Sequence, residues 1–497
     1  MTLGLAAVSA LSFRELTASS SDRAVLRRFY DDVYTPEFPD LDERESLVNI
    51  ERYLELKSEG WYGNNAYHVI VVESAGEAVA GVIADYLAEP NAGVIEFLVV
   101  TPALRGRGLG RRLHDHTEAV LVDDARRAGH PALDYVVAEI NDPFRIDLAA
   151  DNLDPFLRAR VWGGWGYRKL DFPYVQPALS ETQQPVHHLM LAMKPVVAAY
   201  AEAMPAARLR DTVRAYLRWA MRIPDPDANA EYQAMQNHLA VREGVPSIPL
   251  ARYVGHDPTA PLDVEEIVGE GPTFDRVVAV YSSVFPPGAT SIDPAIFRLA
   301  VSGSDSLGAH ARYHLWALRD KPGSAVAGMA SFFSLPGVGF GGYVALAPPL
   351  RGRRRLRSIG ARIEEQMRRD KTGARGWLIE CEPDSKALAI FERLGFREVA
   401  LVYHQPALPS HEGQSPRLAL GYKEFGAVYG TPDLRRDELR EMIHAVFDTV
   451  YGVTVAEHDG LMAALDAQMG EWPTDAVEWR QPFGLRADGH MHRGTTP

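Results

Sequence analysis

Four phrases of this 497-residue sequence occur twice, in the same order. AVAGVIADY (78–86) returns as AVAGMASFF (325–333), and PALRGRGLGRRL (102–113) returns as PPLRGRRRLRSI (348–359). GYRKLDFPYVQPAL (166–179) then matches GFREVALVYHQPAL (395–408), and LRDTVRAYL (209–217) matches LREMIHAVF (439–447). Four ordered matches indicate a duplication, with a repeating unit of roughly 220–240 residues. The sequence therefore predicts two similar domains, which the chain length also favours.

The spacing between the two copies indicates the domain limits. Arg105 and Arg351 are 246 positions apart but Tyr167 and Phe396 are 229 apart, so the first copy holds 17 extra residues (246 minus 229). The Pro-, Asp- and Asn-rich segment 141–161 is where we expect them, as a loop with a short helix. We predict a first domain over 1–195, a helical extension over 196–245, a Pro-rich linker over 246–270, a second domain over 271–425, and a helical extension with a polar tail over 426–497.

The composition argues against several classes of protein. The net charge of −14 disfavours binding to nucleic acid or to an anionic membrane surface. No apolar run reaches the ~20 residues that cross a bilayer, and the first 16 residues resemble a strand more than a signal peptide. The one cysteine, Cys381, allows no internal disulfide, suits the cytoplasm, and is expected to be a buried packing residue. His114 and His116 lack metal-ligand spacing, so no metal is expected.

Alternating strand and helix patterns indicate the fold class. Apolar strands are expected over 11–16, 66–74, 77–87, 93–102, 133–140, 167–179 and 186–195. Helical periodicity is found over 21–34, 42–59 and 110–129. We therefore predict an α/β (more closely, α+β) protein in which each copy is a mixed, mostly antiparallel sheet flanked by helices, with helical extensions after each sheet.

The first copy contains a strand, a glycine-rich turn and a helix in succession. Glycines at 106, 108 and 110 let a phosphate approach the main chain, and a helix N-terminus supplies free N–H groups that bind anions. The spacing G-x-G-x-G differs from a dinucleotide fingerprint, and the absence of a following Gly-Lys-Ser/Thr excludes a nucleotide-binding P-loop. A turn with a purely structural role stays open from these residues alone.

LVVTPALRGRGLGRRL (98–113) resembles the pyrophosphate-binding motif of the GNAT superfamily of N-acyltransferases, with Arg105, Gly108 and Gly110 at its defining positions. The late Gly-Tyr and Gly-Phe pairs at 166 and 395 resemble that family too. The chain thus looks like a tandem GNAT protein, similar in organisation to the mycothiol synthases. The resemblance implies acetyl-CoA or another acyl-CoA as co-substrate and no metal. The implied contact residues are Leu98, Val99, Val100, Arg105, Gly106, Arg107, Gly108, Leu109, Gly110 and Arg111.

The second copy of the turn has lost two of its three glycines. Arg354 and Leu356 stand where the first copy has Gly108 and Gly110, and a long side chain at 354 would crowd a phosphate. We therefore expect the second domain to be degenerate. The alternatives are phosphate binding by charge, a nucleic-acid patch, and a solvated helix start, which is the plainest interpretation of Arg351, Arg353, Arg354, Arg355 and Arg357.

Acyl transfer to an amine needs a base and a donor to the developing oxyanion. Glu96, in the strand before the turn, is our first candidate for the base or amine anchor, with a salt bridge at the sheet edge as the alternative. The second copy has Gly342 at this position. Glu139, on the following strand, is the second candidate. The oxyanion contact is expected at a backbone N–H near Val99 or Val100.

Other candidates for proton transfer are weaker. Tyr67 and His68 lie in a strand, where such residues are more often hydrogen-bonded core groups. The resemblance implies a tyrosine as general acid five residues before the late aromatic, but this chain has Trp162 there and Phe391 in the second copy. Another tyrosine, such as Tyr135 or one near the extra segment, or else solvent, would take that role.

The resulting hypothesis is an N-acyltransferase that moves an acyl group, in the first place acetyl, from acyl-CoA to a primary amine of a small molecule or natural product, in the first domain. The alternatives are transfer from a carrier-protein thioester or other chemistry on this scaffold, and a non-catalytic acyl-CoA-binding module. The partner is a small-molecule amine, without nucleic acid or membrane. The helical extensions would bridge the repeats, which is the preferred role, or else cover the acceptor cleft or form a homodimer.

Overall fold

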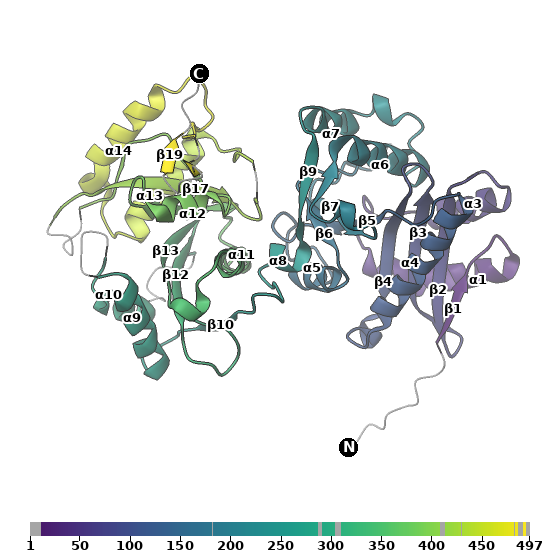
Figure 1. The fold of residues 1–497 in the computed structure, drawn as a ribbon, viewed down its shortest axis with the longest axis horizontal. Helices are drawn as coiled ribbons and strands as arrows, with labels where there is room; N and C mark the ends of the chain where they lie inside the picture. The colour runs from purple at the N-terminus through teal and green to yellow at the C-terminus, as the bar shows by residue number, and fades with distance from the viewer. Residues whose placement is uncertain are drawn as a thin grey trace, which may run out of the picture. The chain divides into compact units, whose positions relative to one another are not determined.

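The computed structural model describes residues 11–180, 182–286, 291–303, 310–407, 413–428, 430–481, 483–485 and 491–493. The chain divides into two compact units, Met1–Ala251 and Arg252–Pro497. Each unit has its own sheet and its own helices (Figure 1).

The N-terminal unit is built on a nine-stranded sheet of order β1-β2-β3-β4-β5-β7-β6-β9-β8. All neighbours are antiparallel except β4 and β5, which run parallel. This agrees with the mixed, mostly antiparallel sheet predicted from the sequence. The strands are β1 (Ser12–Glu15), β2 (Ala66–Ser74), β3 (Glu77–Leu87), β4 (Ala92–Val100), β5 (Tyr135–Asn141), β6 (Arg168–Leu170), β7 (Leu189–Pro195), β8 (Ala203–Pro205) and β9 (Gly244–Pro249).

Helices cover both faces of this sheet because its strands are apolar on both faces. In β2, Tyr67, Val69 and Val71 belong to the core under α1 and α3, whereas His68 between them reaches Asp124 of α4 on the other face. The helices are α1 (Ser20–Phe29), α2 (Thr35–Glu37), α3 (Leu47–Ser58), α4 (Leu109–Arg127), α5 (Pro155–Gly164), α6 (Ala206–Trp219) and α7 (Ala230–Ala240), with α8 (Leu250–Tyr253) at the boundary between the units.

The C-terminal unit repeats this plan. Its sheet has the order β10-β11-β12-β13-β14-β17-β15, with one parallel pair, β13 and β14, at the equivalent place. The strands are β10 (Asp263–Glu266), β11 (Arg312–Arg319), β12 (Gly328–Leu335), β13 (Val338–Leu346), β14 (Gly376–Cys381), β15 (Arg397–Glu398), β16 (Tyr403–His404) and β17 (Arg417–Glu424), with a separate hairpin of β18 (Phe483–Leu485) and β19 (Met491–Arg493). The helices are α9 (Pro272–Val284), α10 (Ala295–Ser302), α11 (Arg353–Arg369), α12 (Lys386–Glu392), α13 (Arg436–Thr449) and α14 (Val455–Gly470).

The segment expected as a linker, 246–270, differs from that expectation. It contains most of β9, which pairs with β6 and β8 in the first sheet, and all of β10, which pairs with β11 in the second. Its prolines misled the sequence interpretation, because proline is tolerated on short and edge strands. Of the polar tail, 486–490 and 494–497 lie outside the described residues.

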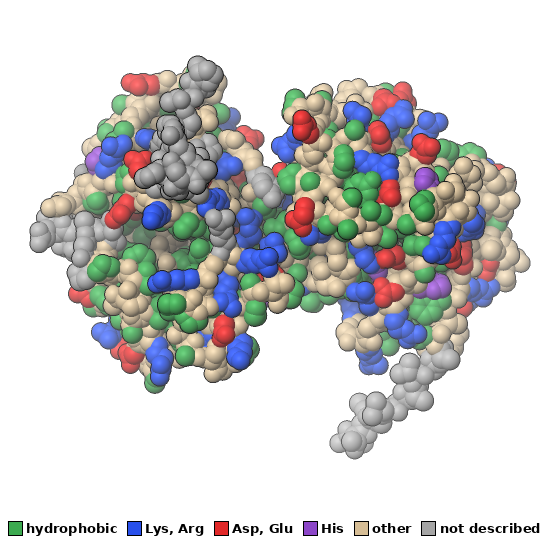
Figure 2. Space-filling model, in the orientation of Figure 1, with side chains coloured by type: hydrophobic (Ala, Val, Ile, Leu, Met, Phe, Trp, Pro, Cys, Tyr) green, Lys and Arg blue, Asp and Glu red, His purple; other side chains and the backbone are tan. Residues whose placement is uncertain are grey.

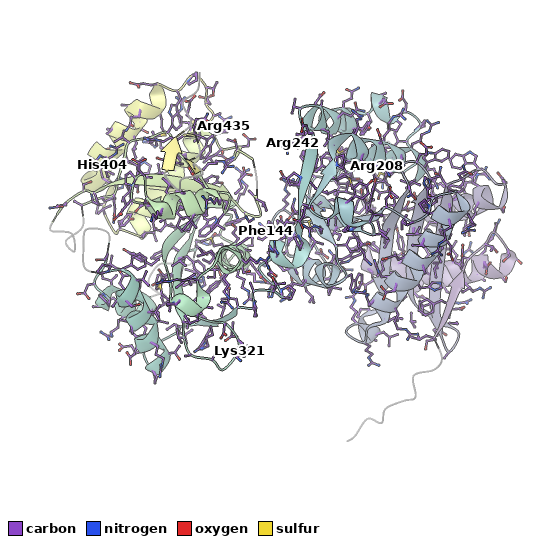
Figure 3. The ribbon with its side chains drawn as sticks, in the orientation of Figure 1. Phe144, Arg208, Arg242, Lys321, His404 and Arg435 are labelled. Carbon is purple, nitrogen blue, oxygen red and sulfur yellow. The ribbon has the colours of Figure 1, made fainter. Side chains whose placement is uncertain are left out.

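Of the 17 extra residues of the first copy, 12 lie between Ala138 of β5 and Tyr167, since Ala138 and the equivalently paired Ile379 are 241 positions apart (241 minus 229). Asp154 caps α5 by accepting a hydrogen bond from the N–H of Phe156 at 2.9 Å. Phe144, labelled in Figure 3, packs edge-on against Phe156 with ring centroids 5.2 Å apart. The segment is thus anchored by an aromatic pair at the start of α5.

The helical extensions pack on the sheets of their own units. Leu209 and Val213 of α6 share a core with β5 and β7, and Leu439 and Ile443 of α13 share one with β14 and β17. Of the three roles considered for these helices, the packing agrees best with covering the region beside each central strand pair.

Candidate active site

The two central strands of the N-terminal unit separate midway along their length. The parallel pairing joins Ala92–Ile95 of β4 to Tyr135–Ala138 of β5, and in the described residues it ends there. Glu96 and Glu139 are the next residue on each strand. The structure therefore brings both predicted carboxylates to the point where β4 and β5 diverge.

Glu96 lies in a β-bulge, which turns its side chain toward Asp85 of β3. The register of β3 and β4 shifts at this point, since Ile83 pairs with Phe97 but Ala84 pairs with Ile95. Burial, and then the negative charge of Asp85, raise the pKa of Glu96 well above its ordinary value. Burial raises the pKa of Asp85 as well. The two acids form a pair in which Glu96 is the group that retains a proton more strongly.

A cation from a distant part of the sequence accompanies this acidic pair. Arg222, just after α6, has its guanidinium carbon 4.2 Å from the ring centroid of Tyr53, and it donates a hydrogen bond to the hydroxyl of Tyr62. Asp85 and Glu96 in turn raise the pKa of Arg222, against the opposing effect of burial. Three further rings complete a cage around the guanidinium at 5.1–5.8 Å, those of Trp61, Tyr62 and Tyr67.

This cluster contains buried polar atoms that lack a hydrogen-bond partner among the described residues. They are both carboxylate oxygens of Asp85, Oε1 of Glu96, the hydroxyl of Tyr67, and Nε and Nη1 of Arg222. A proton held by Glu96 can bond to Asp85, and the remaining polar atoms of the cluster are open to polar groups from outside the chain. Sequence reasoning missed Asp85 and Arg222. Tyr67, rated weak there, lies in the cluster.

Glu139 is held differently, because its carboxylate is already occupied. The Tyr174 hydroxyl donates a hydrogen bond to Oε1. Burial raises the pKa of Glu139 to about 7, against hydrogen bonds from Tyr174 and Tyr216 that lower it. Glu139 is thus paired with two tyrosines, whereas Glu96 is paired with a second carboxyl, that of Asp85.

The glycine turn has the backbone that an anion site requires. Gly106 and Gly108 have φ of 74° and 79°, and an added Cβ would have no neighbour within 4 Å at either position, so the turn is open to its surroundings. The first hydrogen bond of α4 runs from the N–H of Arg112 to the carbonyl of Gly108. The N–H groups of Leu109, Gly110 and Arg111 accordingly have no acceptor within the helix.

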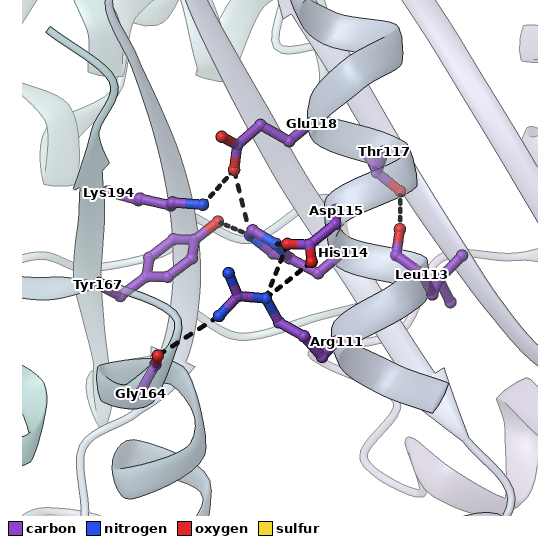
Figure 4. A network of polar contacts seen from close by, with 9 residues as sticks. All are labelled: Arg111, Leu113, His114, Asp115, Thr117, Glu118, Gly164, Tyr167 and Lys194. Atoms are coloured by element: carbon purple, nitrogen blue, oxygen red, sulfur yellow. Dashed lines mark hydrogen bonds and ion pairs between the residues drawn. The ribbon is translucent and has the colours of Figure 1, made fainter. Parts of the chain in front are cut away.

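Two arginines of the turn, Arg105 and Arg111, are engaged with the protein, whereas Arg107 is exposed. Arg105 donates from Nε to the carbonyl of Val100 at 3.1 Å and forms an ion pair with Glu37. Arg111 binds Asp115 through Nε at 2.8 Å and the carbonyl of Gly164 through Nη1 (Figure 4). Arg111 therefore offers the turn its backbone N–H rather than its guanidinium.

The backbone of β4 presents alternate residues to the gap beside β5. The N–H of Thr101 bonds to Val79 in β3, so by alternation Val99 also faces β3, while Leu98 and Val100 face the opposite edge. The carbonyl of Val100 does receive Arg105 from that side. Of the backbone groups expected near the reaction centre, Val100 and Leu98 face the gap and Val99 does not.

Residues 26–143, which span Glu96, the turn and Glu139, match the acetyltransferase (GNAT) family. This segment of the N-terminal unit is a member of the GNAT acetyltransferase family. The sequence matches none of the curated proteins.

Three solved structures of GNAT and related acetyltransferases are similar to this chain. A tandem GNAT protein from the clavulanic acid biosynthesis pathway is 15% identical over 85% of this chain and 100% of its own, with a TM-score of 0.26. The ribosomal-protein-S18-alanine N-acetyltransferase from Escherichia coli is 12% identical over 38% of this chain and 94% of its own (TM-score 0.25). An acetyltransferase from Thermus thermophilus is 16% identical over 38% and 99% (TM-score 0.25).

The second unit has helix where the first unit has its glycine turn. Helix α11 begins at Arg353, two aligned positions earlier than α4, and the N–H of Leu356 bonds to the carbonyl of Gly352. Arg354 donates to Thr259 and Arg357 to the carbonyl of Arg393. The side chain of Arg353 lies outside the described residues. These arginines thus make contacts within their own unit.

The remaining tyrosine and histidine candidates of the GNAT domain are packing groups. Tyr135 is buried and hydrogen bonded to Thr212 at 2.7 Å, at the far end of β5 from Glu139. Trp162 packs against Tyr167. His68 is buried between Glu15 and Asp124, each 2.8 Å away. His114 is buried against Tyr167 (Figure 4), and burial lowers its pKa.

The described residues hold neither a metal cluster nor a membrane span. No group of three or more His, Cys, Asp or Glu side chains among them is placed to hold a metal ion, and no described helix has the length and apolar character to span a membrane. On the face drawn in Figure 2, acidic and basic side chains are interspersed over the surface of each unit.

Proposed function

We propose that the N-terminal unit transfers an acyl group, in the first place acetyl, from acyl-CoA to a primary amine of a small molecule. The observation that carries the proposal is the pairing of two features on one strand: Glu96 where β4 leaves β5, and the open turn of Gly106 and Gly108 where β4 ends. One feature suits proton transfer and the other suits a pyrophosphate.

The turn fits the phosphates of the co-substrate. Its left-handed glycines carry no Cβ to obstruct an anion, and the free N–H groups of Leu109, Gly110 and Arg111 are at the positive end of α4. Acyl-CoA supplies the activated thioester. The backbone N–H of Val100 or Leu98 is placed to stabilise negative charge on the carbonyl oxygen.

Glu96 is our candidate for the base that takes a proton from the acceptor amine. Its raised pKa makes it a stronger base than an ordinary carboxylate, and its Oε1 has no partner in the described residues. When Glu96 and Asp85 are both ionised, the cluster that they form with Arg222 has a net charge of minus one. This charge favours a cationic amine over a neutral or anionic acceptor. Glu139 is the less suited base because Tyr174 holds its Oε1.

The test is an acetyl-CoA assay with a panel of primary amines, in which free CoA thiol is measured. We expect turnover with at least one amine, and a loss of about 10²–10⁴-fold in kcat for Glu96→Gln. Turnover only with a carrier-protein thioester would favour the alternative donor. Binding of CoA that survives Glu96→Ala, with no turnover of any amine, would favour a binding module.

A further inference from the structure

The C-terminal unit contains a cavity of about 470 Å³ at the equivalent strand divergence. The pairing of β13 with β14 ends at Gly341 and Ile379, and the next residues, Gly342 and Glu380, both line the cavity. The volume is within the range of small-molecule sites. The cavity is therefore a candidate ligand site in the unit that lacks the anion-binding turn.

Three charged residues of the first unit are replaced by uncharged residues in the second, and these replacements open the space. Gly342 replaces Glu96, and Gly452 replaces Arg222 at the end of the equivalent helix. In the first sheet Asp85 lies opposite Tyr67 and Val94. In the second sheet the equivalent place, opposite Tyr313 and Phe340, is taken by Phe333. The acidic pair and its arginine are thus absent from this unit, and an aromatic ring takes part of their place.

The walls of the cavity are mostly apolar. Aliphatic and aromatic side chains from α10, β12, β13 and β17 line it, including Ile296, Phe297, Ala300, Phe333, Phe340 and Leu418. Burial of such a surface by a ligand contributes about 25 cal/mol per Å². The body of the ligand must therefore be apolar.

One end of the cavity is acidic. Its charged lining residues in the described part of the chain are Glu380 and Glu382, and no Lys or Arg is among them. The carboxylate of Glu380 accepts hydrogen bonds from Tyr403 and Tyr451, each at 2.5 Å. Tyr313, a residue more than nine-tenths buried that carries a hydroxyl, also lines the cavity, next to Ser331. A cationic head group would pair with Glu380 and reach this hydroxyl.

We propose that this cavity binds a hydrophobic amine, with its apolar body against Phe297 and Phe333 and its ammonium group at Glu380. The site goes beyond the acyl transfer proposed for the first unit. Acyl-CoA is not the ligand, because α11 has no open turn for the pyrophosphate.

The test compares three probes of one shape on the full chain by calorimetric titration: 3-phenylpropylamine, 3-phenylpropan-1-ol and 3-phenylpropanoate. We expect the amine to bind at least tenfold more tightly than the alcohol, and the carboxylate to bind more weakly than both. Equal binding of the three probes would overturn the proposal, and so would the lack of any amine binding.

Two variants place the binding in the cavity. Glu380→Gln should weaken the amine at least tenfold and leave the alcohol unchanged, whereas Ala300→Phe, which fills space beside the apolar wall formed by α10, should weaken both. Glu139→Gln is the matched control, because Glu139 is held by two tyrosines in the same way in the other unit, and it should change neither affinity. The assignment would be contradicted if amine binding were lost with Glu139→Gln but kept with Glu380→Gln and Ala300→Phe. If Glu380→Gln does not fold, the result with Ala300→Phe alone tests whether the amine binds in the cavity.

Discussion

Arg222 and Gly452 occupy the same position in the same helix-ending turn, with φ of 58° and 63°. In the first unit the N–H of Met221 bonds to the carbonyl of Tyr216, and the N–H of Ile223 to that of Leu217. The second unit has the same two bonds, from Tyr451 to Val446 and from Val453 to Phe447. Glycine suits this left-handed position, and an L-residue there costs about 1–2 kcal/mol. The N-terminal unit keeps an arginine in spite of that cost, because the guanidinium lies among four rings and next to two acids.

Replacing Arg222 tests its link to the acidic pair. Arg222→Gly is compatible with the turn, as Gly452 demonstrates, but it removes the positive charge that lowers the pKa of Glu96. We expect the rising limb of the pH profile of kcat/KM to move to higher pH by about one unit, so that activity below the limb falls about tenfold. Arg222→Lys, which keeps the charge, should hold the limb near its original place. A limb that does not move in Arg222→Gly would separate Arg222 from the base.

Glu139 should behave as a structural acid. Its pKa is raised from 4.5 to about 7 by burial, so the folded state favours the protonated form more than the unfolded state does. The wild-type chain therefore loses stability as pH rises from about 4.5 to 7, by up to about 3 kcal/mol. Glu139→Gln should remove this part of the pH dependence while keeping most of kcat, in contrast to Glu96→Gln. Thermal unfolding at pH 5 and pH 8 measures it, and an unchanged pH dependence in the variant would contradict the account.

A buried histidine joins three elements in each unit, which predicts a second pH effect. His314 contacts Glu266 of β10 at 3.2 Å and Asp370, just after α11, at 3.0 Å, as His68 contacts Glu15 and Asp124. Burial would lower the pKa of His314, but the hydrogen bonds to Asp370 and Glu266 outweigh it and raise the pKa to about 9.

The sign of this effect follows from the raised pKa. The stabilisation is complete below the unfolded-state pKa of about 6.5 and is lost as pH rises through about 9. His314→Gln should lower the melting temperature at pH 6 and have a much smaller effect at pH 10. An equal loss at both pH values would mean that the charge of His314 does not matter.

The duplication predicted two similar domains, each with a mixed, mostly antiparallel sheet, because it is a long-range pattern in the sequence itself. The glycine turn and the position of Glu96 on the strand before it follow from the repeated phrases and from periodicity, whereas the parallel pair of strands was seen only in the structure. Glu139 was also found, as a carboxylate within an apolar strand.

What could not be predicted depends on contacts between distant segments. Arg222 approaches Glu96 from 126 positions away, and the bulge that turns Glu96 toward Asp85 leaves no mark in the sequence. One signal was present: extending the match of α6 and α13 aligns Arg222 with Gly452, a change that would be expected at a functional turn. The cavity beside Glu380 required the structure, since it arises from three small exchanges on three different elements.

The central claim is that acyl-CoA binds at the turn of the N-terminal unit, and titration of acetyl-CoA into two matched variants tests it most directly. Gly108→Arg copies the residue of the second unit into the turn. Gly129→Arg has the same backbone cost at the other end of α4, since Gly129 has φ of 92° and no atom within 4 Å of an added Cβ. We predict one acetyl-CoA per chain, at least a tenfold loss of affinity with Gly108→Arg, and wild-type affinity with Gly129→Arg. Wild-type affinity in Gly108→Arg would contradict the account.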